Sequence, residues 1–302
     1  MKASVEALAR VLGERARRDE PLAAYTHMGV GGPADLLLVC RTGEELVEAV
    51  QQARAHGVPW RVLGGGCNVL VADAGVRGLV LINQANRSRI HDDGTLWSEA
   101  GAPISPLARQ TAARGLAGLE WAAGLPGTVG GAVVGNAGAF DGDVAAVLRQ
   151  VTILERDGTV AERPGEWMEL DYRSSRIKRQ PADERPVVLA ATFALRPGDP
   201  SALLARVAEL LEWRRTRHPS GATMGSTFKN PPGSHAGYLI EQAGLRGYTI
   251  GGAQVSPLHG NFFMNLGHAT AADVRALIEY VRAEVERQFG VRLELEVELV
   301  GE

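Results

Sequence analysis

The most unusual polar cluster of the chain is segment 225–232, which reads Gly-Ser-Thr-Phe-Lys-Asn-Pro-Pro. It combines two hydroxyl groups and a side-chain amide with Lys229, one of only three lysines in the chain. Such groups can hold an oxyanion or transfer a proton. The flanking glycine and prolines favour a loop of fixed shape. An ordinary polar surface loop accounts for the same residues nearly as well.

Charged groups at three further places are candidates for binding a charged substrate. Segment 172–176 reads Tyr-Arg-Ser-Ser-Arg, which is typical of a solvated basic turn but also suits an anion. Segment 213–218 gathers arginines at the expected end of a helix, where they complement the helix dipole or bind a pyrophosphate. Segment 293–299 alternates apolar residues with three glutamates, normally the wet face of an edge strand. One buried carboxylate among them could act as an acid or base.

Two glycine-rich segments predict that a ligand approaches the backbone closely. Residues 120–143 hold seven glycines among small apolar residues, although glycine loses the most backbone entropy on ordering. Residues 64–66 are three consecutive glycines followed by Cys67 and Asn68, and successive N–H groups in such a turn can converge on an anion. A mobile linker and a tight strand-to-strand turn are the respective alternatives. The apolar filling and the third glycine disfavour them.

The common nucleotide-binding and hydrolytic motifs are missing from the sequence. None of the three lysines follows a glycine, which excludes a P-loop. Segment 29–34 formally matches G-x-G-x-x-A, but it leads into the strand-like run 35–39 instead of a helix. Seven histidines and two cysteines show no metal-ligand spacing, and G-x-S-x-G does not occur.

Alternating helices and strands must position these groups. A capping box at 42–45 and Asp-Gly hairpin signals at 93–94 and 157–158 are the clearest local features. Periodicity predicts helices within 1–20 and over 42–57, 105–114, 201–217, 235–243 and 270–290. It predicts strands over 60–63, 79–82, 88–91, 96–100, 151–155, 160–163, 187–195 and 293–300.

Size and composition narrow the class of protein. At 302 residues and 45% hydrophobic content the chain can form two or three domains, and the turn-forming segment 197–200 predicts one boundary. A net charge of −3 argues against a general nucleic-acid or anionic-membrane surface. No apolar run approaches the ~20 residues of a membrane span, and the first 20 residues lack a signal-peptide core. Two cysteines fit a reducing cytoplasm.

Taken together, these segments closely resemble the UDP-N-acetylenolpyruvoylglucosamine reductase (UDP-N-acetylmuramate dehydrogenase) family. The two glycine segments alone would indicate only the wider class of flavoproteins with the same FAD-binding domain. The resemblance covers nearly the whole chain. The matching segments, in family order, are 25–32, 63–71, 118–120, 123–132, 136–139, 172–175, 225–231 and 293–297.

The resemblance implies an α+β fold. A PCMH-type FAD-binding region would consist of two α+β subdomains, 1–84 and 85–198. A smaller α+β substrate-binding domain, 199–302, would follow, and its last strand would return a carboxylate to the active site. NADPH would reduce non-covalent FAD and leave, and the enolpyruvyl UDP-sugar would then take hydride from flavin N5. The resemblance also implies a cytoplasmic enzyme of peptidoglycan precursor synthesis, without a metal, nucleic acid, membrane or obligate protein partner.

Residue roles follow from motif position in the family. Ser226 would protonate the carbanion, with support from Lys229, Asn230 or a water, while Arg173 and Glu296 would hold the substrate carboxylate. Glu296 should then be protonated or hydrogen-bonded, because two carboxylates repel. The expected substrate-binding residues are Tyr172, Arg214, Arg217, Lys229 and Asn230. The expected cofactor-binding residues are Thr26, Gly64, Gly65, Gly66, Cys67, Asn68, Ala123, Gly124, Gly127, Thr128, Gly131, Asn136 and Gly138.

The chain departs from the family pattern at a few positions. Leu295 stands where proline is frequent, and Cys67 stands where serine is common. No tyrosine lies between Arg173 and Ser226, which indicates the shorter subgroup without a tyrosine-bearing loop. His27 raises the question of a covalent flavin, but the family implies non-covalent FAD. Two alternatives remain open: an FAD-linked sugar or alcohol oxidase, and a regulator that has lost the catalytic step.

Overall fold

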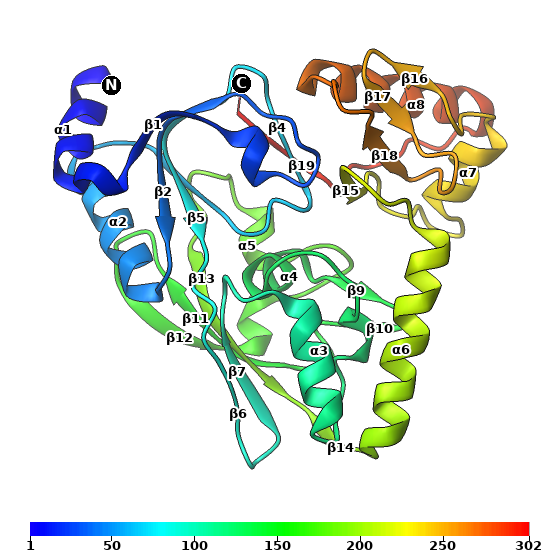
Figure 1. Ribbon diagram of the computed structural model, residues 1–302, viewed down its shortest axis with the longest axis horizontal. Helices are drawn as coiled ribbons and strands as arrows, with labels where there is room; N and C mark the ends of the chain where they lie inside the picture. The colour runs from blue at the N-terminus through cyan, green and yellow to red at the C-terminus, as the bar shows by residue number, and fades with distance from the viewer. Residues whose placement is uncertain (302) are drawn as a thin grey trace. The chain divides into compact units, whose positions relative to one another are not determined.

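The computed structural model describes residues 1–301 and consists of two compact units, each built from separate stretches of the chain (Figure 1). Unit 1 comprises Met1–Arg17, Leu36–Gly65 and Gly78–Trp213. Unit 2 comprises Arg18–Asp35, Gly66–Arg77 and Arg214–Glu302. No helix within residues 1–301 is long and apolar enough to cross a membrane.

The first layer of unit 1 consists of helices α1 (Lys2–Leu12) and α2 (Gly43–Ala55) and the neighbouring strands (Figure 1). The strand order is β1 (Arg17–Pro21), β2 (Pro33–Cys40), β5 (Val76–Asn83) and β3 (Trp60–Leu63). Residues 18–21, 33–35 and 76–77 of these strands count with unit 2. Thr42 caps α2, because its hydroxyl accepts the Glu45 N–H at 3.1 Å. Helix α1 is shorter than the amphipathic segment 1–20, since Gly13, at φ 61°, ends it before β1 begins.

The second layer of unit 1 is a five-stranded antiparallel sheet. Its order is β12 (Val160–Pro164), β11 (Leu148–Leu154), β13 (Val187–Ala194), β7 (Thr95–Glu99) and β6 (Ser88–Ile90). Both expected hairpins, β6–β7 and β11–β12, are therefore present. Three helices belong to this layer: α3 (Ile104–Ala113), α4 (Val129–Gly135) and α5 (Arg176–Arg179).

Helix α3 begins two residues earlier than the sequence predicts. Its N-cap is Pro103, and the Ser105 hydroxyl, expected to be the cap, accepts the Gly124 N–H at 2.8 Å instead. The Ile104 N–H donates to the Gly127 carbonyl at 3.1 Å. The beginning of α3 is thus tied to the glycine-rich segment.

Short elements complete unit 1 and lead out of it. Two-residue strands pair as β8 (Leu116–Ala117) with β14 (Arg196–Pro197), and as β9 (Gly138–Ala139) with β10 (Gly142–Asp143). The 3-10 helices are η1 (Gly13–Arg15), η2 (Leu22–Tyr25), η3 (Glu120–Ala122) and η4 (Gly165–Met168). The long helix α6 (Pro200–Arg217) buries Val207 and Leu210 against Ala112 and Ala123.

Unit 2 combines a small antiparallel sheet with two helices. The sheet order is β15 (Thr223–Ser226), β18 (Phe262–Asn265), β17 (Ala253–Val255) and β16 (Thr249–Ile250). The helices are α7 (Ala236–Gln242) and α8 (Ala271–Phe289), and α8 has the expected Thr270–Asp273 capping box. A separate parallel pair joins β4 (Val69–Val71) to β19 (Glu298–Val300).

Packing groups the chain differently from the three domains expected along the sequence. Met28, Val30 and Leu70 belong to the same buried cluster as the apolar residues of α7 and α8. Burying apolar surface is the main favourable term in folding, so these N-terminal segments join the C-terminal part of the chain. The three-domain division stays a prediction.

The last segment does not form the single alternating strand that was expected. Only Glu298–Val300 is a strand, and Leu295 makes an isolated bridge to Phe228. Leu293 and Val297 are buried, but Leu299 is 44% exposed and Val300 is buried instead. The phase of burial shifts because residues 298–300 pair with β4 after residue 295 has paired with Phe228. The three glutamates therefore do not share one continuous face.

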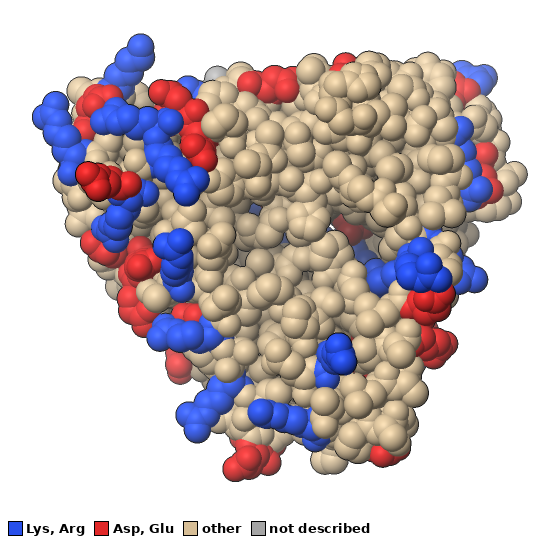
Figure 2. All heavy atoms as spheres, in the orientation of Figure 1, with Lys and Arg blue, Asp and Glu red and all other residues tan. Residues whose placement is uncertain are grey.

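Charged side chains of both signs are interspersed over the N-terminal helices α1 and α2. Figure 2 shows Lys and Arg alternating with Asp and Glu on that part of the visible face. Arg15 of unit 1, for example, lies 3.5 Å from Glu48 of α2. The mixture agrees with the small net charge of −3.

Candidate active site

The two glycine-rich segments meet within unit 1. A Cβ placed on Gly64 would lie 2.4 Å from the Thr128 hydroxyl oxygen, a distance that no side chain tolerates. Thr128 caps α4, and its hydroxyl accepts the Gly131 N–H at 3.5 Å. The close approach requires glycine at residue 64 and brings the end of β3 against the beginning of α4.

Part of the glycine content serves the protein's own packing. A Cβ on Gly130 would lie 2.8 Å from the Ala100 Cβ, and one on Gly142 would lie 2.5 Å from Trp121. A Cβ on Gly138 would lie 2.6 Å from the Asp143 Cβ. A ligand is therefore not needed to explain these three glycines.

Two glycines of α4 have room for a side chain and still lack one. A Cβ on Gly131 would have its nearest neighbour, the Thr128 hydroxyl, at 3.6 Å, and one on Gly135 would meet nothing within 4 Å. Glycine within a helix costs about 0.5–1 kcal/mol relative to alanine. Packing within unit 1 gives no reason for that cost. Bare backbone with open space beside it suits a flat or phosphate-bearing cofactor.

The end of α4 is anchored by Asn136, which is buried and adopts the left-handed conformation at φ 41°. Its side-chain oxygen accepts the Ala145 N–H at 3.0 Å, and its side-chain nitrogen donates to the Asp171 carbonyl at 3.0 Å. Asn136 thereby ties the glycine-rich segment to the turn that carries Arg173.

Arg173 lies in that tight turn, which Asp171 and Ser174 close with reciprocal backbone hydrogen bonds. Its φ of 53° falls in the left-handed region, where a residue other than glycine is strained. The guanidinium donates to the carbonyls of Asn136, at 3.2 Å, and Gly138, at 2.5 Å. It also lies 5.4 Å from the centre of the Tyr172 ring. These contacts hold Arg173 beside the C-terminal end of α4.

In unit 2, hydrogen bonds bring the Glu296 backbone next to the end of β15. The Glu296 N–H donates to the carbonyl of Thr227, the residue after Ser226, at 2.9 Å. Asn68 supports the same segment: its side-chain nitrogen donates to the Glu296 carbonyl, and its own carbonyl accepts the Glu298 N–H, both at 3.1 Å. Ser226 and Glu296 thus lie on adjoining segments of one unit.

Ser226 lines a pocket of about 270 Å³ within unit 2. Asn261, one of the lining residues, makes hydrogen bonds in both directions with the Phe228 backbone, at 2.9 and 2.8 Å, which fixes it to the segment after Ser226. The pocket contains several groups that can donate hydrogen bonds to an oxyanion. Its lining is Ser226, Asn230, His235, Gly237, Tyr238, Glu241, Arg246, His259, Gly260 and Asn261.

Comparison with known proteins identifies the family. One family model, described as UDP-N-acetylenolpyruvoylglucosamine reductase, C-terminal domain, matches residues 217–300. Another, described as FAD binding domain, matches residues 34–162. A UDP-N-acetylenolpyruvoylglucosamine reductase of Rubrobacter xylanophilus is 48% identical over 288 residues, covering 95% of this chain and 96% of the relative. That of Chloroflexus aggregans is 43% identical, covering 94% and 97%.

A solved structure agrees with these relatives. The crystal structure of UDP-N-acetylenolpyruvylglucosamine reductase from Thermus caldophilus has a TM-score of 0.81 and 36% identity, covering 95% of this chain and 99% of that chain. This chain belongs to the UDP-N-acetylenolpyruvoylglucosamine reductase family. It is an FAD-dependent oxidoreductase, and the expected α+β fold with a PCMH-type FAD-binding region is confirmed. Assignment to the shorter subgroup stays a prediction.

The cofactor-binding residues expected for this reductase family fall in both units. Unit 1 holds Gly64, Gly65, Ala123, Gly124, Gly127, Thr128, Gly131, Asn136 and Gly138, and unit 2 holds Thr26, Gly66, Cys67 and Asn68. In unit 2 the buried Thr26 hydroxyl donates to the Val30 carbonyl at 2.8 Å. Burial raises the pKa of the Cys67 thiol to about 11, so it is uncharged at neutral pH. A neutral thiol fits a site in which backbone groups do the binding.

The expected substrate-binding and catalytic residues are also divided. Arg173 and Tyr172 belong to unit 1, whereas Ser226, Glu296, Arg214, Arg217, Lys229 and Asn230 belong to unit 2. Asn230 lines the Ser226 pocket, and its side chain accepts the Ala236 N–H at 3.0 Å. The Lys229 ammonium lies 3.4 Å from Glu294. Arg214 is half-buried, and burial lowers its pKa. The roles of these residues stay predictions.

Sequence reasoning overlooked the pocket residues His235, Arg246 and His259. His259 accepts the Asn261 N–H through Nδ1 at 3.2 Å, and its ring contacts Phe262 and His218 edge to face. Burial and the neighbouring Arg246 lower the pKa of His259. The only signal in the sequence is the turn-rich segment 256–261 before a strand, which is too common to single out a site. Among residues 1–301, no cluster of histidine, cysteine and carboxylate side chains could hold a metal ion.

Proposed function

We propose that this protein reduces the enolpyruvyl ether of UDP-N-acetylglucosamine enolpyruvate to UDP-N-acetylmuramate, with NADPH as the electron source and non-covalent FAD as the carrier. The proposal rests on the reductase-specific match over residues 217–300, which contains Ser226 and Glu296 on adjoining segments. Both NADPH and UDP-sugars belong to the cytoplasm, and we infer that the enzyme acts there, in peptidoglycan precursor synthesis.

FAD, when bound, supplies the hydride that adds to the methylene carbon of the substrate. The chain supplies the rest of the reaction. The Ser226 hydroxyl delivers a proton to the adjacent carbon, so that the double bond gains one hydride and one proton. Arg173 pairs with the substrate carboxylate and stabilises the negative charge that develops beside it. Glu296, in its protonated form, donates a hydrogen bond to the same carboxylate.

The Ser226 pocket is the proposed site for the sugar-nucleotide phosphates. Hydrogen-bond donors in this pocket include Arg246 and Asn230. His259 adds its Nε2–H, because its Nδ1 already accepts a backbone N–H. Arg214 and Arg217 add positive charge to unit 2 and remain our candidates for diphosphate contacts, while Lys229 remains a candidate to bind substrate and to support Ser226. Tyr172, which is 48% exposed beside Arg173, is proposed to contact the substrate from unit 1.

An anaerobic stopped-flow measurement of flavin absorbance tests the proposed function. NADPH should bleach the flavin band, and colour should return only when the enolpyruvyl sugar nucleotide is added. Recovery with oxygen and a simple sugar, but not with the enolpyruvyl ether, would instead identify a sugar oxidase. A flavin that NADPH never bleaches would support a regulator that has lost the reaction.

A further inference from the structure

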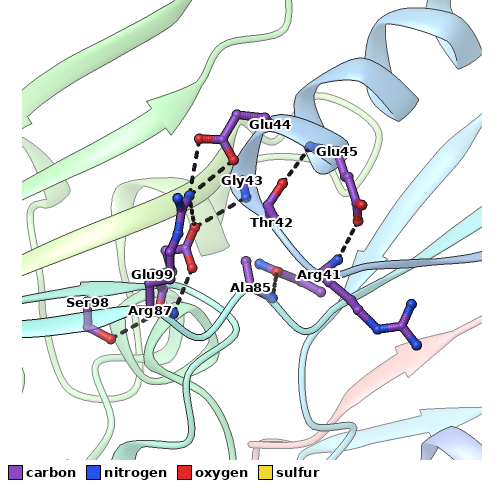
Figure 3. A network of polar contacts seen from close by, with 10 residues as sticks. Arg41, Thr42, Gly43, Glu44, Glu45, Ala85, Arg87, Ser98 and Glu99 are labelled. Carbon is purple, nitrogen blue, oxygen red and sulfur yellow. Dashed lines mark hydrogen bonds and ion pairs between the residues drawn. The ribbon is translucent and has the colours of Figure 1, made fainter.

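A buried carboxylate that has no part in the proposed reaction joins three segments of unit 1 (Figure 3). The Glu99 side chain, at the end of β7, is only 3% exposed. Its Oε1 accepts a hydrogen bond from Arg87 Nη2 at 2.7 Å and from the Gly43 N–H at 3.3 Å. Its Oε2 accepts the Arg87 backbone N–H at 2.7 Å. The start of α2, the 85–87 linker and the end of β7 thus meet on one carboxylate.

Stability alone is a weak reason to bury such a group. The free-energy cost of desolvating an ion pair is often as large as the Coulombic attraction gained between the charges. Apolar residues can therefore often replace a buried pair without loss of stability. The partner guanidinium of Arg87 is 58% exposed and also binds Glu44, which is 73% exposed. Three N–H donors converge on Glu99, and only a carboxylate can accept all of them with both of its oxygens. We therefore interpret the role of Glu99 as fixing the relative positions of the three segments that it joins.

The residues after Glu99 transmit that position to α4. The Ala100 carbonyl accepts the Gly130 N–H, and the Ala102 carbonyl accepts the Val129 N–H, both at 2.8 Å. Between them Gly101 is wedged against the linker, since a Cβ there would lie 2.6 Å from the Ala85 backbone. The turn 99–102 is therefore fixed on one side by the linker and on the other by the first turn of α4.

The first turn of α4 lies directly against the glycine turn that follows β3. Thr128 contacts Gly64 so closely that a Cβ on residue 64 would lie 2.4 Å from its hydroxyl. We propose that Glu99 is a positioning residue for FAD: its buried carboxylate fixes the beginning of α4 relative to Gly64 and so sets the spacing of the two backbone segments that hold the cofactor diphosphate. The inference rests on the FAD-binding region, and it holds whichever substrate the enzyme reduces.

The test is FAD binding to apoprotein carrying Glu99→Gln. The amide keeps the shape of the carboxylate but turns an NH₂ group toward an N–H donor. The N–H donor left unpaired should let the turn 99–102 and the beginning of α4 move from their place beside Gly64, so we expect FAD to bind about tenfold more weakly. Phosphorus-31 NMR of bound FAD should show shifted diphosphate resonances, while the visible flavin band stays nearly unchanged.

Two controls separate positioning from general destabilisation. Glu44→Gln removes the exposed partner of the same Arg87 and should leave FAD affinity and the phosphorus spectrum unchanged. Leu8→Ala opens a cavity in the buried cluster between α1 and α2, so it should lower the melting temperature without weakening FAD binding. If Leu8→Ala and Glu99→Gln weaken FAD equally at equal loss of stability, or if Glu99→Gln leaves both readouts unchanged, the proposal is wrong.

A milder variant covers the case in which Glu99→Gln fails to fold. Arg87→Met removes the 2.7 Å side-chain bond but keeps the backbone N–H that Glu99 accepts. We expect a smaller loss of FAD affinity and a smaller phosphorus shift in the same direction. Wild-type affinity together with an unshifted phosphorus spectrum would overturn the proposal as well. Enzyme turnover is not needed for any of these readouts.

Discussion

Ser226 owes its position to main-chain contacts on both sides. It pairs with Phe262 across the sheet, and the following Thr227 carbonyl receives the Glu296 N–H. A serine hydroxyl is a weak acid in water, so its proposed role depends on where it is held rather than on its intrinsic acidity. The pocket around it adds polar neighbours that the sequence order alone does not reveal.

Replacing Ser226 by alanine should separate the two half-reactions. We expect bleaching of the flavin by NADPH to proceed at the normal rate, because the hydroxyl takes no part in it. Reoxidation by the enolpyruvyl sugar nucleotide should slow by about 10²- to 10⁴-fold, the usual contribution of a positioned general acid. Single-turnover stopped-flow measures both steps, and the exposed Ser220→Ala is the matched control. Equal slowing of the two steps would assign Ser226 to FAD or fold instead.

His218 makes unit 2 sensitive to mild acid. Burial, and to a lesser extent Arg214 and His259, lower the pKa of His218 to about 4 from its ordinary value of 6.5. Below pH 6.5, His218 therefore binds a proton in the unfolded chain but stays neutral in the folded protein until the pH approaches 4. We expect the free energy of unfolding to fall as the pH drops from 6.5 toward 4, with no contribution from this group above that range.

Denaturant titrations at several pH values between 7 and 5 would measure this loss. Staying above pH 5 avoids the carboxylates Glu44 and Glu284, whose pKa values near 2 shift their own contribution to lower pH. His218→Gln should reduce the pH dependence, leaving the part due to His259, whose pKa is also lowered, whereas the exposed His268→Gln should retain it in full. An unchanged slope in His218→Gln would mean that another group causes the loss.

Among the elements, α4 shows how packing and ligand binding divide the glycines. Gly130 is needed because Ala100 lies against it, while Gly131 faces open space. The sequence predicts a ligand behind the whole segment, but it cannot distinguish these two causes. Both produce the same residue type, and the difference lies in a neighbour that is distant in sequence.

Gly131→Ala should therefore have opposite effects on the apoprotein and on FAD binding. Alanine is better than glycine in a helix by about 0.5–1 kcal/mol, so the melting temperature of the apoprotein should rise slightly. The added methyl group should weaken FAD binding. Gly130→Ala, its neighbour, should instead lower the melting temperature of the apoprotein. Thermal unfolding and a fluorescence titration with FAD give both numbers, and undiminished FAD affinity in Gly131→Ala would show that the cofactor does not use that surface.

Helix α8 depends on a carboxylate from a remote segment. Asp73 accepts the N–H groups of Ala271 and Ala272 at 2.8 Å each, in addition to the local Thr270–Asp273 capping box. Asp73→Ala should lower the free energy of unfolding by about 0.5–2 kcal/mol, the range found for lost helix caps. Urea denaturation would measure the loss, with Asp92→Ala in an exposed turn as the control. Equal stability of the two variants would show that the local capping box suffices.

At the scale of the whole molecule, the sequence locates local features, whereas it carries no signal for which distant segments pack together. The Thr42 cap, the Thr270–Asp273 capping box and the two Asp-Gly hairpins lie where the sequence predicts them, because neighbouring residues decide them. The box at Thr42 is incomplete, since the Glu45 carboxylate accepts the Arg41 N–H instead. The first helix ends earlier and α3 starts earlier than predicted. The pocket residues His235 and His259 are not predictable from the sequence, because only the fold of unit 2 brings these distant residues into one pocket.

In the candidate site, too, the identity of several residues is predictable from the sequence, but the contacts that position them are not. Motif positions predicted Ser226, Glu296 and Asn68, and the fold brings the latter two into contact through the Asn68 side chain. Nothing in the sequence predicts the anchoring of Arg173 on the carbonyls beside α4, since a positive φ at arginine has no sequence signature. The grouping of Met28, Val30 and Leu70 with the C-terminal helices was equally unpredictable from chain order.

The parallel pairing of β4 with β19 bears on how the protein is made. Residues 69–71 are synthesised well over 200 residues before their partners, residues 298–300. Until then β4 keeps an open row of backbone donors and acceptors, which is a template for aggregation. Such distant pairing also slows folding, because the entropy of closing the long loop is lost before the strand contacts can stabilise the chain. Nascent chains should consequently need protection of this strand, for example by a chaperone, until residues 298–300 have been synthesised.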